Sequence, residues 1–429
     1  MNDIDFRKKF YQNVEPRQAL DPRNKEFYVE LDDAVVRGDD ISRRLLTDIE
    51  FSSGDSVSLV TGPRGSGKST ELLRIANKQL ETSNKRPILY ADVEEFLGTN
   101  EPIEPAEFFP VLVAGLIQAI STLGYGIDIT PFTERLSSFF RRIRADVNLA
   151  VAVEEGPISL SASLKPYLKD DNSFKSEIQN YLTNNRREFR EEMHSIINDV
   201  TSALRDIGPT PVFIMDSLEH FRGTSLSHVG IVDSIKTLFS DFVDELSLPG
   251  LHVVYCVPSY VNCNRANTYP MLNVKVSTLQ NDCFGDYEEG ITQLREVLEK
   301  RVPQNESLTR LLNDKITQNL VICASGGLFR DLFRLVGAII TDADLLPADE
   351  TVISKAKSFC RVQITGWPSG LNREQYNVLR IIKNNPHFEY SRGQQYDFDY
   401  LETIGAILRY QNGAEGNLLA VHPLLYSVL

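Results

Sequence analysis

A short glycine-rich stretch carries residues whose types and spacing could bind phosphate. It runs Gly62-Pro63-Arg64-Gly65-Ser66-Gly67-Lys68-Ser69 and matches the P-loop pattern G-x-x-x-x-G-K-[ST]. Glycines let the backbone fold around an anion, so that N–H groups and a helix N-terminus point at the phosphates. We expect Lys68 to reach the β- and γ-phosphates, Ser69 to bind Mg²⁺ and Thr70 to contact the α-phosphate. The candidate nucleotide-binding residues are Gly62, Arg64, Gly65, Ser66, Gly67, Lys68, Ser69 and Thr70.

A second group of candidate residues follows an apolar run much later in the chain. Pro211 to Met215 reads as a buried parallel strand, and it ends in Asp216. We expect Asp216 to hold the hydration shell of Mg²⁺. Glu219, three residues on, is the candidate for orienting an attacking water. Ser217 stands where many ATPases carry that glutamate, so a structural or partner-facing role for Glu219 stays open.

The elements that must position these residues are strands and helices in alternation. The run Val57–Val60 predicts the strand before the P-loop, and an apolar helical pattern follows it. Further strands are predicted over 87–93, over 251–257 and near 272–276. Ser259, just beyond the third of these, is a candidate for sensing the γ-phosphate. This alternation predicts an α/β fold with a parallel sheet.

A long interval, about 97–205, separates the two groups of candidate residues. It predicts a helix over 105–122, another near 131–144 and a long one over 174–206. Apolar residues alternate strictly from Val147 to Leu164 around a Glu-Gly-Pro turn, which predicts a β-hairpin. We therefore expect a helix–hairpin–helix insertion that carries partner or oligomer contacts, because a simple crossover is much shorter.

Composition narrows the class of protein. The chain has 429 residues, 42% of them hydrophobic, which is ample for two or three domains with real cores. A formal charge of −14 argues against general nucleic-acid binding, although it leaves room for a local basic groove. The 5 cysteines show no metal-type spacing. There is no N-terminal apolar segment and no run of 18 apolar residues, so we expect a cytoplasmic protein without membrane contact.

After a predicted helix over 287–301 comes the sequence Ser325-Gly326-Gly327-Leu328-Phe329-Arg330-Asp331-Leu332. The order of P-loop, Asp-Ser-Leu-Glu, strand ending in Pro-Ser, and helical lid with S-G-G-x-x-R-D-L resembles AAA+ or STAND-type ATPases, close to the initiator-like and signal-transduction branches. The resemblance covers about 57–96 and 205–345. It implies ATP and Mg²⁺ as cofactors and Arg330 as a second sensor of the γ-phosphate. It also implies that Arg265 acts as a finger toward a neighbouring subunit.

The last part of the chain, 371–429, reads as two helices and a two-stranded hairpin, which resembles a winged helix. Its charge is 5 − 6 = −1 from Lys/Arg and Asp/Glu, so protein contact is favoured over DNA reading. The predicted domains are a lead-in at 1–56, an ATPase core at 57–285, a lid at 286–368 and a winged-helix-like domain at 369–429.

These features favour an ATPase that acts as an oligomerising switch for a protein partner or effector, and the resemblance makes antiviral defence a reasonable setting. A nucleic-acid remodelling or loading ATPase is the alternative. A GTPase is disfavoured because each Asn-Lys pair lacks the Asp of the base-reading motif. Two departures from the family, Ser217 and Ser259 in place of Glu and Asn, bear on hydrolysis more than on ATP binding.

Overall fold

The chain folds into two compact units. The computed structural model describes residues 1–15, 19–81, 86–122, 126–147, 149, 160–221, 228–276, 287–366, 370–411 and 417–429. One unit, here the sheet unit, comprises Ser42–Thr61 and Leu72–Tyr269. The other, here the lid unit, comprises Met1–Ile41, Gly62–Glu71 and Pro270–Leu429. The P-loop residues therefore cluster with the lid, although they follow a strand of the sheet in the chain.

The sheet unit is built on five strands in the order β2-β3-β4-β1-β5. Their bounds are Ser56–Thr61 (β1), Ile88–Asp92 (β2), Val212–Asp216 (β3), His252–Val257 (β4) and Asn267–Pro270 (β5). The pairs β1–β4, β4–β3 and β3–β2 are parallel, as predicted. Every residue of β3 and β4 is buried, which is typical of central strands in a parallel sheet covered on both faces.

The fifth strand lies earlier than the sequence predicts. We expected it near 272–276, but β5 ends at Pro270. The apolar residues that follow are buried without joining a strand: the Asn273 N–H donates to Arg409 O at 3.0 Å, and the Lys275 N–H donates to Val36 O at 2.9 Å. Their apolar pattern reflects burial inside the lid unit, which a periodicity argument cannot separate from burial in a sheet.

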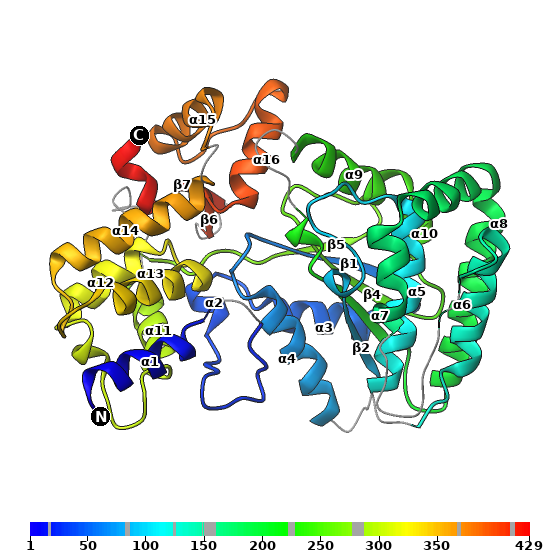
Figure 1. Ribbon diagram of the computed structural model, residues 1–429, viewed down its shortest axis with the longest axis horizontal. Coiled ribbons are helices and arrows are strands. Elements are labelled where there is room, and N and C mark those ends of the chain that lie inside the picture. The colour runs from blue at the N-terminus through cyan, green and yellow to red at the C-terminus, as the bar shows by residue number, and fades with distance from the viewer. Residues whose placement is uncertain are drawn as a thin grey trace. The chain divides into compact units, whose positions relative to one another are not determined.

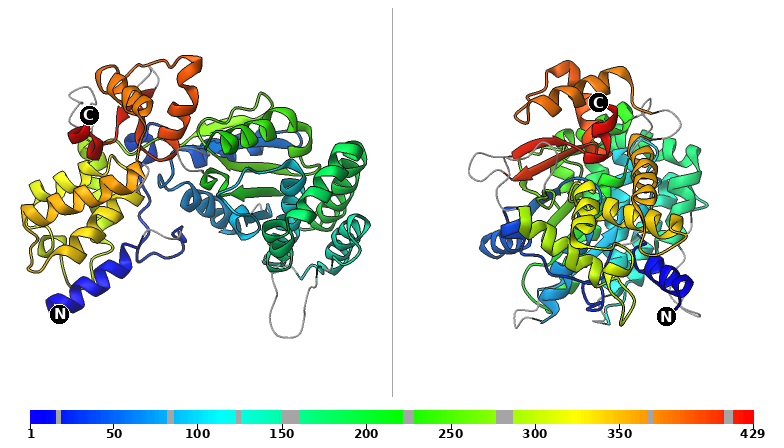
Figure 2. Two further views of the ribbon diagram at one scale, coloured as in Figure 1. Left: turned by 45° about the horizontal axis from the view of Figure 1, so that its top comes forward. Right: turned by 90° about the vertical axis from the view of Figure 1, so that its left-hand side faces the viewer.

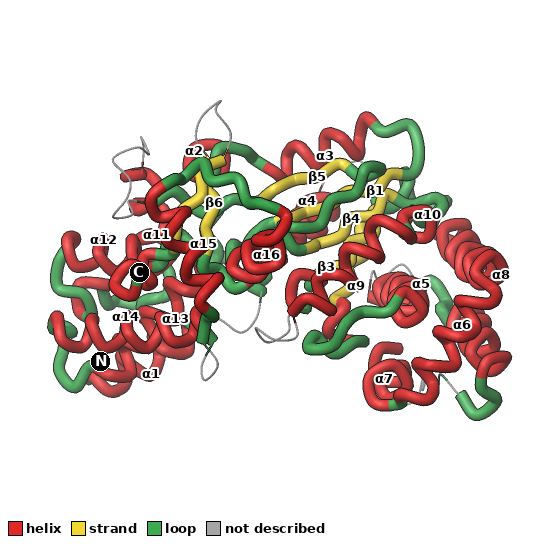
Figure 3. The backbone as a smooth tube through the Cα atoms, turned by 90° about the horizontal axis from the view of Figure 1, so that it is seen from above, coloured by secondary structure: helices red, strands yellow, loops and turns green. Residues whose placement is uncertain are grey.

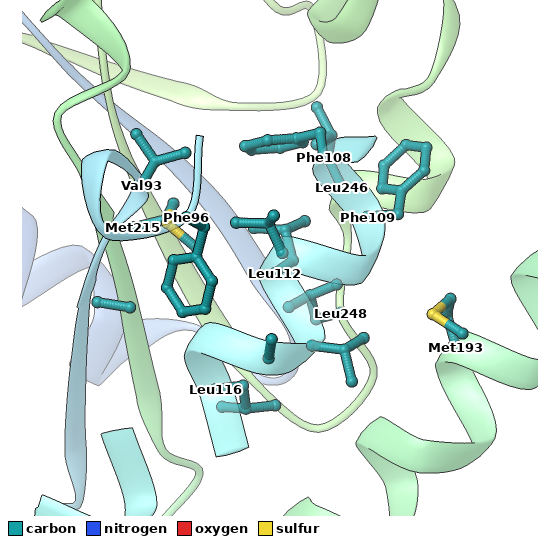
Figure 4. Packing of buried hydrophobic residues seen from close by; sticks show 14 of the residues in the cluster. Val93, Phe96, Phe108, Phe109, Leu112, Leu116, Met193, Met215, Leu246 and Leu248 are labelled. Carbon is teal, nitrogen blue, oxygen red and sulfur yellow. The ribbon is translucent and has the colours of Figure 1, made fainter. Parts of the chain in front are cut away.

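Helix α5 (Pro105–Thr122) is the central helix of the sheet unit. It packs on β2 and β3, where a Cβ at Gly115 would lie 3.0 Å from the Ala91 Cβ and 3.2 Å from the Met215 Cε. Leu112 and Leu116 lie between Met215 of β3 and Met193 of the insertion (Figure 4). By length and composition α5 could cross a membrane, but 83% of that apolar window is buried inside the protein, so α5 is a core helix.

Other helices complete the sheet unit. Helices α5 and α9 lie on one side of the strands and α3 on the other (Figure 3). The bounds are Ile41–Phe51 (α3), Lys68–Glu81 (α4), His228–Asp241 (α9) and Val243–Leu246 (α10). Helix α4 begins in the P-loop, so its first residues belong to the lid unit and the rest to the sheet unit.

The insertion between β2 and β3 is helical where the structure describes it. Helix α8 (Asn172–Leu204) packs on α5, and α6 (Thr130–Ile143) packs on α8 (Figure 1). The second arm of the predicted hairpin is wrong: Leu160–Lys165 is helix α7, continued by a π-helical turn. Leu160, Leu164 and Leu168 are all buried at a spacing of four, which fits one face of a helix as well as one face of a strand. Most of the first arm and the turn lie outside the described residues.

The lid unit joins the N-terminal residues, the lid helices and the C-terminal segment in one hydrophobic core. Phe6 of α1, Leu335 of α13 and Leu425 near the C-terminal end belong to it. Helices α15 and α16 lie against the β6–β7 hairpin, drawn in orange and red in Figure 2. The bounds are Asp3–Asn13 (α1), Asp33–Val36 (α2), Tyr287–Glu299 (α11), Lys315–Ala324 (α12), Phe329–Asp342 (α13), Glu350–Thr365 (α14), Arg373–Asn384 (α15), Gln395–Thr403 (α16), Ile407–Gln411 (β6) and Asn417–Val421 (β7).

Candidate nucleotide-binding site

The P-loop follows β1 directly and is closely packed from the lid side. Gly62 and Gly65 have φ of +146° and +86°, in the region that favours glycine. A Cβ at Gly62 would lie 2.4 Å from Met271 O, and one at Gly65 would lie 2.4 Å from the Arg330 Cβ. Neither position has room for a side chain, so the loop keeps a bare backbone of the kind that can approach phosphate.

Lys68 is held inside this loop. Its side chain is buried at 2% exposure, and its Nζ donates to Gly62 O at 3.0 Å and Pro63 O at 2.9 Å. Helix α4 begins at Lys68, so Ser69 and Thr70 lie in its first turn. A helix N-terminus with a buried ammonium beside it is suited to an anion, which would replace loop carbonyls as the partner of Lys68.

Arg37 supports the loop from the lead-in segment. Its side chain is buried and donates from Nη2 to Ser66 O at 2.8 Å, and its Nη1 lies 3.4 Å from the Asp33 carboxylate. The guanidinium also lies over the Phe329 ring, 5.4 Å from its centroid. The sequence does not indicate this residue, because no spacing pattern links an arginine in the lead-in segment to the P-loop that follows it.

Arg330 of α13 reaches the P-loop within the lid unit. Its backbone N–H donates to Gly65 O at 3.4 Å, and its Nε donates to the Asp331 carboxylate at 3.2 Å. The side chain is 10% exposed. The predicted lid arginine thus lies against the predicted phosphate loop.

The carboxylates gather at the carboxyl edge of the sheet. Asp216 ends β3 and is fully buried, and the Tyr90 hydroxyl donates to its Oδ2 at 2.6 Å. Asp92, at the end of β2, is its register partner in the parallel pair. Ligand atoms of Asp216, Glu219 and Cys256 all lie within 4.8 Å of one another. Strands β2 and β3 both end in Asp in the sequence, so their pairing in a parallel sheet could have predicted that Asp92 and Asp216 are register partners. The sequence gives no sign that Tyr90 and Cys256 lie near Asp216.

The close packing around Asp216 shifts the pKa values of its neighbours Asp92 and Tyr90. Burial raises the pKa of Asp92 to about 6, and the neighbouring charge of Asp216 adds to the rise. Burial also raises the pKa of the Tyr90 phenol well above its usual range, with Asp216 beside it as a further cause. Tyr90 therefore stays protonated and donates a hydrogen bond to Asp216.

The turn after β3 places Glu219, three positions after Asp216, in a buried position. Ser217 adopts φ +71°, a left-handed conformation that few non-glycine residues accept, and its N–H donates to Asp216 Oδ1 at 2.7 Å. The chain then forms a 3₁₀ turn over Leu218–His220, in which Glu219 is buried at 4% exposure. Strained backbone of this kind is common at functional sites.

The residues present fit Mg²⁺ only in part. Carboxylate and hydroxyl oxygens such as those of Asp216 and Ser69 are the ligands that Mg²⁺ takes in nucleotide sites. The Cys256 sulfur is a soft donor and does not suit this ion. Asp216 therefore fits as a holder of the ion, with Cys256 as a buried neighbour.

Ser259 and Arg265 lie in different surroundings. Strand β4 lies between β1, which leads into the P-loop, and β3, which ends in Asp216. Ser259 is half-buried just beyond the end of β4. At the spacing of neighbouring strands, β1 and β3 are roughly 10 Å apart. Arg265 is 65% exposed, and its ion-pair partner among the described residues is Asp244 of α10 rather than Asp216 or Glu219.

Comparisons with known proteins add a set of distant structural likenesses. No protein-family model matches the chain, and no curated protein matches it either. The Walker-type ATPase PABY2304 of Pyrococcus abyssi is 15% identical with a TM-score of 0.45, over 94% of this chain and 99% of that one. The Aeropyrum pernix ORC2 protein in its ADP form is 12% identical with a TM-score of 0.41, over 97% and 94%. The Aeropyrum pernix ORC1 protein in complex with DNA is 12% identical with a TM-score of 0.38, over 96% and 93%.

The parallel sheet, the glycine loop after β1 and the helix that begins at Lys68 together give the chain a P-loop α/β fold.

Proposed function

We propose that the protein binds ATP with Mg²⁺ and hydrolyses it, as an ATPase of the AAA+ type. The observation that supports this most is the closely packed glycine loop with Lys68 buried inside it at the start of α4. The same chain carries buried Asp216 and Glu219 at the carboxyl edge of the sheet that contains the P-loop strand.

Each residue has a distinct role in this proposal. Lys68 binds the β- and γ-phosphates, and Ser69 and Asp216 hold the metal ion. When bound, Mg²⁺ would supply positive charge that stabilises the phosphate oxygens. Glu219 accepts a hydrogen bond from the attacking water and orients it, and Ser259 contacts the γ-phosphate. Arg64, Ser66 and Thr70 complete the loop around the polyphosphate.

At the level of biology we propose an oligomerising switch that acts on a protein partner. Arg265 is an exposed cation, and in this proposal it contacts the nucleotide of another subunit. The C-terminal segment has a charge of −1, which favours a protein partner over DNA. A role in antiviral defence is an expectation from resemblance, and no residue of this chain supports it.

A nucleic-acid loading ATPase is the second candidate. The Aeropyrum pernix ORC1 protein, whose structure was solved in complex with DNA, is 12% identical to this chain. Binding of duplex DNA that depends on the C-terminal segment and weakens steeply with salt would favour this candidate over the switch.

The test is ATP·Mg²⁺ affinity of Lys68→Ala, measured by titration calorimetry. Losing a charge-assisted contact of roughly 1.5–3 kcal/mol predicts affinity about ten- to a hundredfold weaker. Lys9→Ala, at an exposed position of α1, is the matched control and should bind like the wild type. Unchanged affinity and turnover in Lys68→Ala would refute the proposed site.

A further inference from the structure

The lid arginine is held by residues from three segments of the lid unit. Arg330 lies on Gly65 of the P-loop, and a Cβ at Gly405, just before β6, would lie 3.3 Å from its Nη2. Within the described residues its hydrogen bonds involve the backbone N–H and Nε, and its two terminal nitrogens have none. Its position is therefore fixed at Nε, which leaves the end of the guanidinium available.

Asp331 accepts the hydrogen bond from the Nε of Arg330. Its side chain is buried at 1% exposure, its Oδ1 accepts from Arg330, and the same oxygen accepts from Arg334 at 3.3 Å. Burial raises the pKa of this carboxyl, but the charge of Arg330 and the side-chain interaction with His422 outweigh burial and hold the pKa well below the usual range. Asp331 is thus a buried anion whose Oδ2 remains without a hydrogen bond among the described residues.

His422, from the C-terminal segment, faces that oxygen. The His422 ring is fully buried, and its Nδ1 accepts the Leu424 N–H at 3.2 Å. A ring nitrogen that accepts a hydrogen bond carries no proton, so the proton is on Nε2. Nε2 lies 3.6 Å from Asp331 Oδ2, too long for a hydrogen bond, and the contact is electrostatic.

The C-terminal hairpin is fastened to the loop before Arg330 as well. The Tyr410 hydroxyl of β6 donates to Gly326 O at 2.7 Å, and a Cβ at Gly326 would lie 2.4 Å from the Leu408 Cδ1. Leu328, Leu408, Tyr410, Leu418 and Ala420 form a small core of their own. The hairpin and His422 therefore hold the Gly326–Asp331 stretch from one side.

We propose that Asp331 positions Arg330 for the polyphosphate, and that His422 in turn positions Asp331, so the C-terminal segment is a working part of the nucleotide site. This inference rests on the proposed function. Holding Nε orients the planar guanidinium, and its four remaining N–H donors can then meet phosphate oxygens in a fixed geometry. Movement of the C-terminal segment by a partner would pass through His422 and Asp331 to Arg330.

Two substitutions separate positioning from mere structure. His422→Asn keeps an acceptor for the Leu424 N–H but cannot reach Asp331, whereas His422→Gln can present an amide N–H near the Nε2 position. We expect His422→Asn to bind ATP·Mg²⁺ about three- to tenfold more weakly than the wild type, and His422→Gln to bind nearly as the wild type does. His387→Asn, an exposed histidine of the same segment, is the matched control.

The deciding measurement repeats His422→Asn in an Arg330→Ala background. If His422 acts through Arg330, the added substitution changes affinity by less than about twofold there. An equal loss in both backgrounds, or a loss in His422→Gln but not in His422→Asn, would overturn the inference. Asp331→Asn replaces His422→Asn in the same cycle if that variant does not fold.

The outcomes also separate this inference from the proposed function. If the wild type binds no ATP·Mg²⁺, or if Lys68→Ala binds as well as it does, the proposed function fails and this inference with it. If Lys68→Ala loses affinity while the His422 effect persists without Arg330, only the inference fails.

Discussion

Glu219 is a buried carboxylate close to Asp216, which suits it to orienting a water molecule. Because only that step loses its carboxylate, Glu219→Gln is expected to keep ATP bound while turnover falls by about 10²–10⁴. The affinity for ATP·Mg²⁺ and the rate of single-turnover hydrolysis are measured on the same preparation. Glu188→Gln, exposed on α8, should match the wild type. Equal loss of binding and turnover would assign Glu219 a structural role instead.

At the residue scale, the sequence predicts the parts of the site that belong to one continuous motif. The P-loop and Asp216 can each be recognised from their residue types, from the spacing of those residues and from the strand that precedes them. Arg37, Tyr90 and His422 do not, because their contacts join residues far apart in the chain. Long-range packing decides those contacts, and no local pattern encodes it.

At the element scale, Glu107 of α5 gives the core a dependence on pH. Burial raises the pKa of this carboxyl to about 7, against the opposing pull of Lys175, whose Nζ lies 3.7 Å away. At pH values between the pKa of Glu107 in the unfolded chain and its folded pKa of about 7, the folded chain binds the Glu107 proton more tightly than the unfolded chain does. The free energy of unfolding therefore falls as pH rises through that range.

Glu107→Gln replaces the carboxyl with a neutral group of the same shape and should remove this dependence. We expect it to stabilise the protein by roughly 1–3 kcal/mol at pH 8 and to change little at pH 4.5. Denaturant unfolding at both pH values measures the difference. Glu134→Gln, exposed on α6, is the control. If the stability of the variant depends on pH as strongly as that of the wild type, the pKa of Glu107 is not raised in the folded chain.

Elements were predicted best where a pattern was long or was confirmed by its neighbours. The helix expected over 174–206 is α8, and the strand ending in Asp216 is β3. The segment Leu160–Lys165 is too short for alternation to exclude a helix, and its leucines fit both periods. The run at 272–276 is apolar because the lid unit buries it. In both cases the pattern reported burial correctly and the type of element wrongly.

At the scale of the whole molecule, Arg265 offers a test of assembly. If it reaches the γ-phosphate of a neighbouring subunit, Arg265→Ala and Lys68→Ala are each inactive alone. Mixing the two should restore part of the ATPase activity, because some interfaces then pair an intact P-loop with an intact arginine. Light scattering on the mixture establishes that the subunits assemble together. Mixed assemblies that stay inactive would exclude this role for Arg265.

The lid unit takes residues from both sides of the sheet unit in the chain, and this sets an order of events during synthesis. Residues 1–41 leave the ribosome before the sheet unit but cannot bury Phe6 and Phe10 until residues after 270 have been made. The sheet unit can fold meanwhile, since its own core is complete at Tyr269. At about 5–20 residues per second, the remaining segment takes on the order of ten seconds to emerge. During that time the P-loop lacks Met271 and Arg330, which pack against it in the folded protein, so we expect a nascent chain to bind nucleotide only after the lid helices have been made.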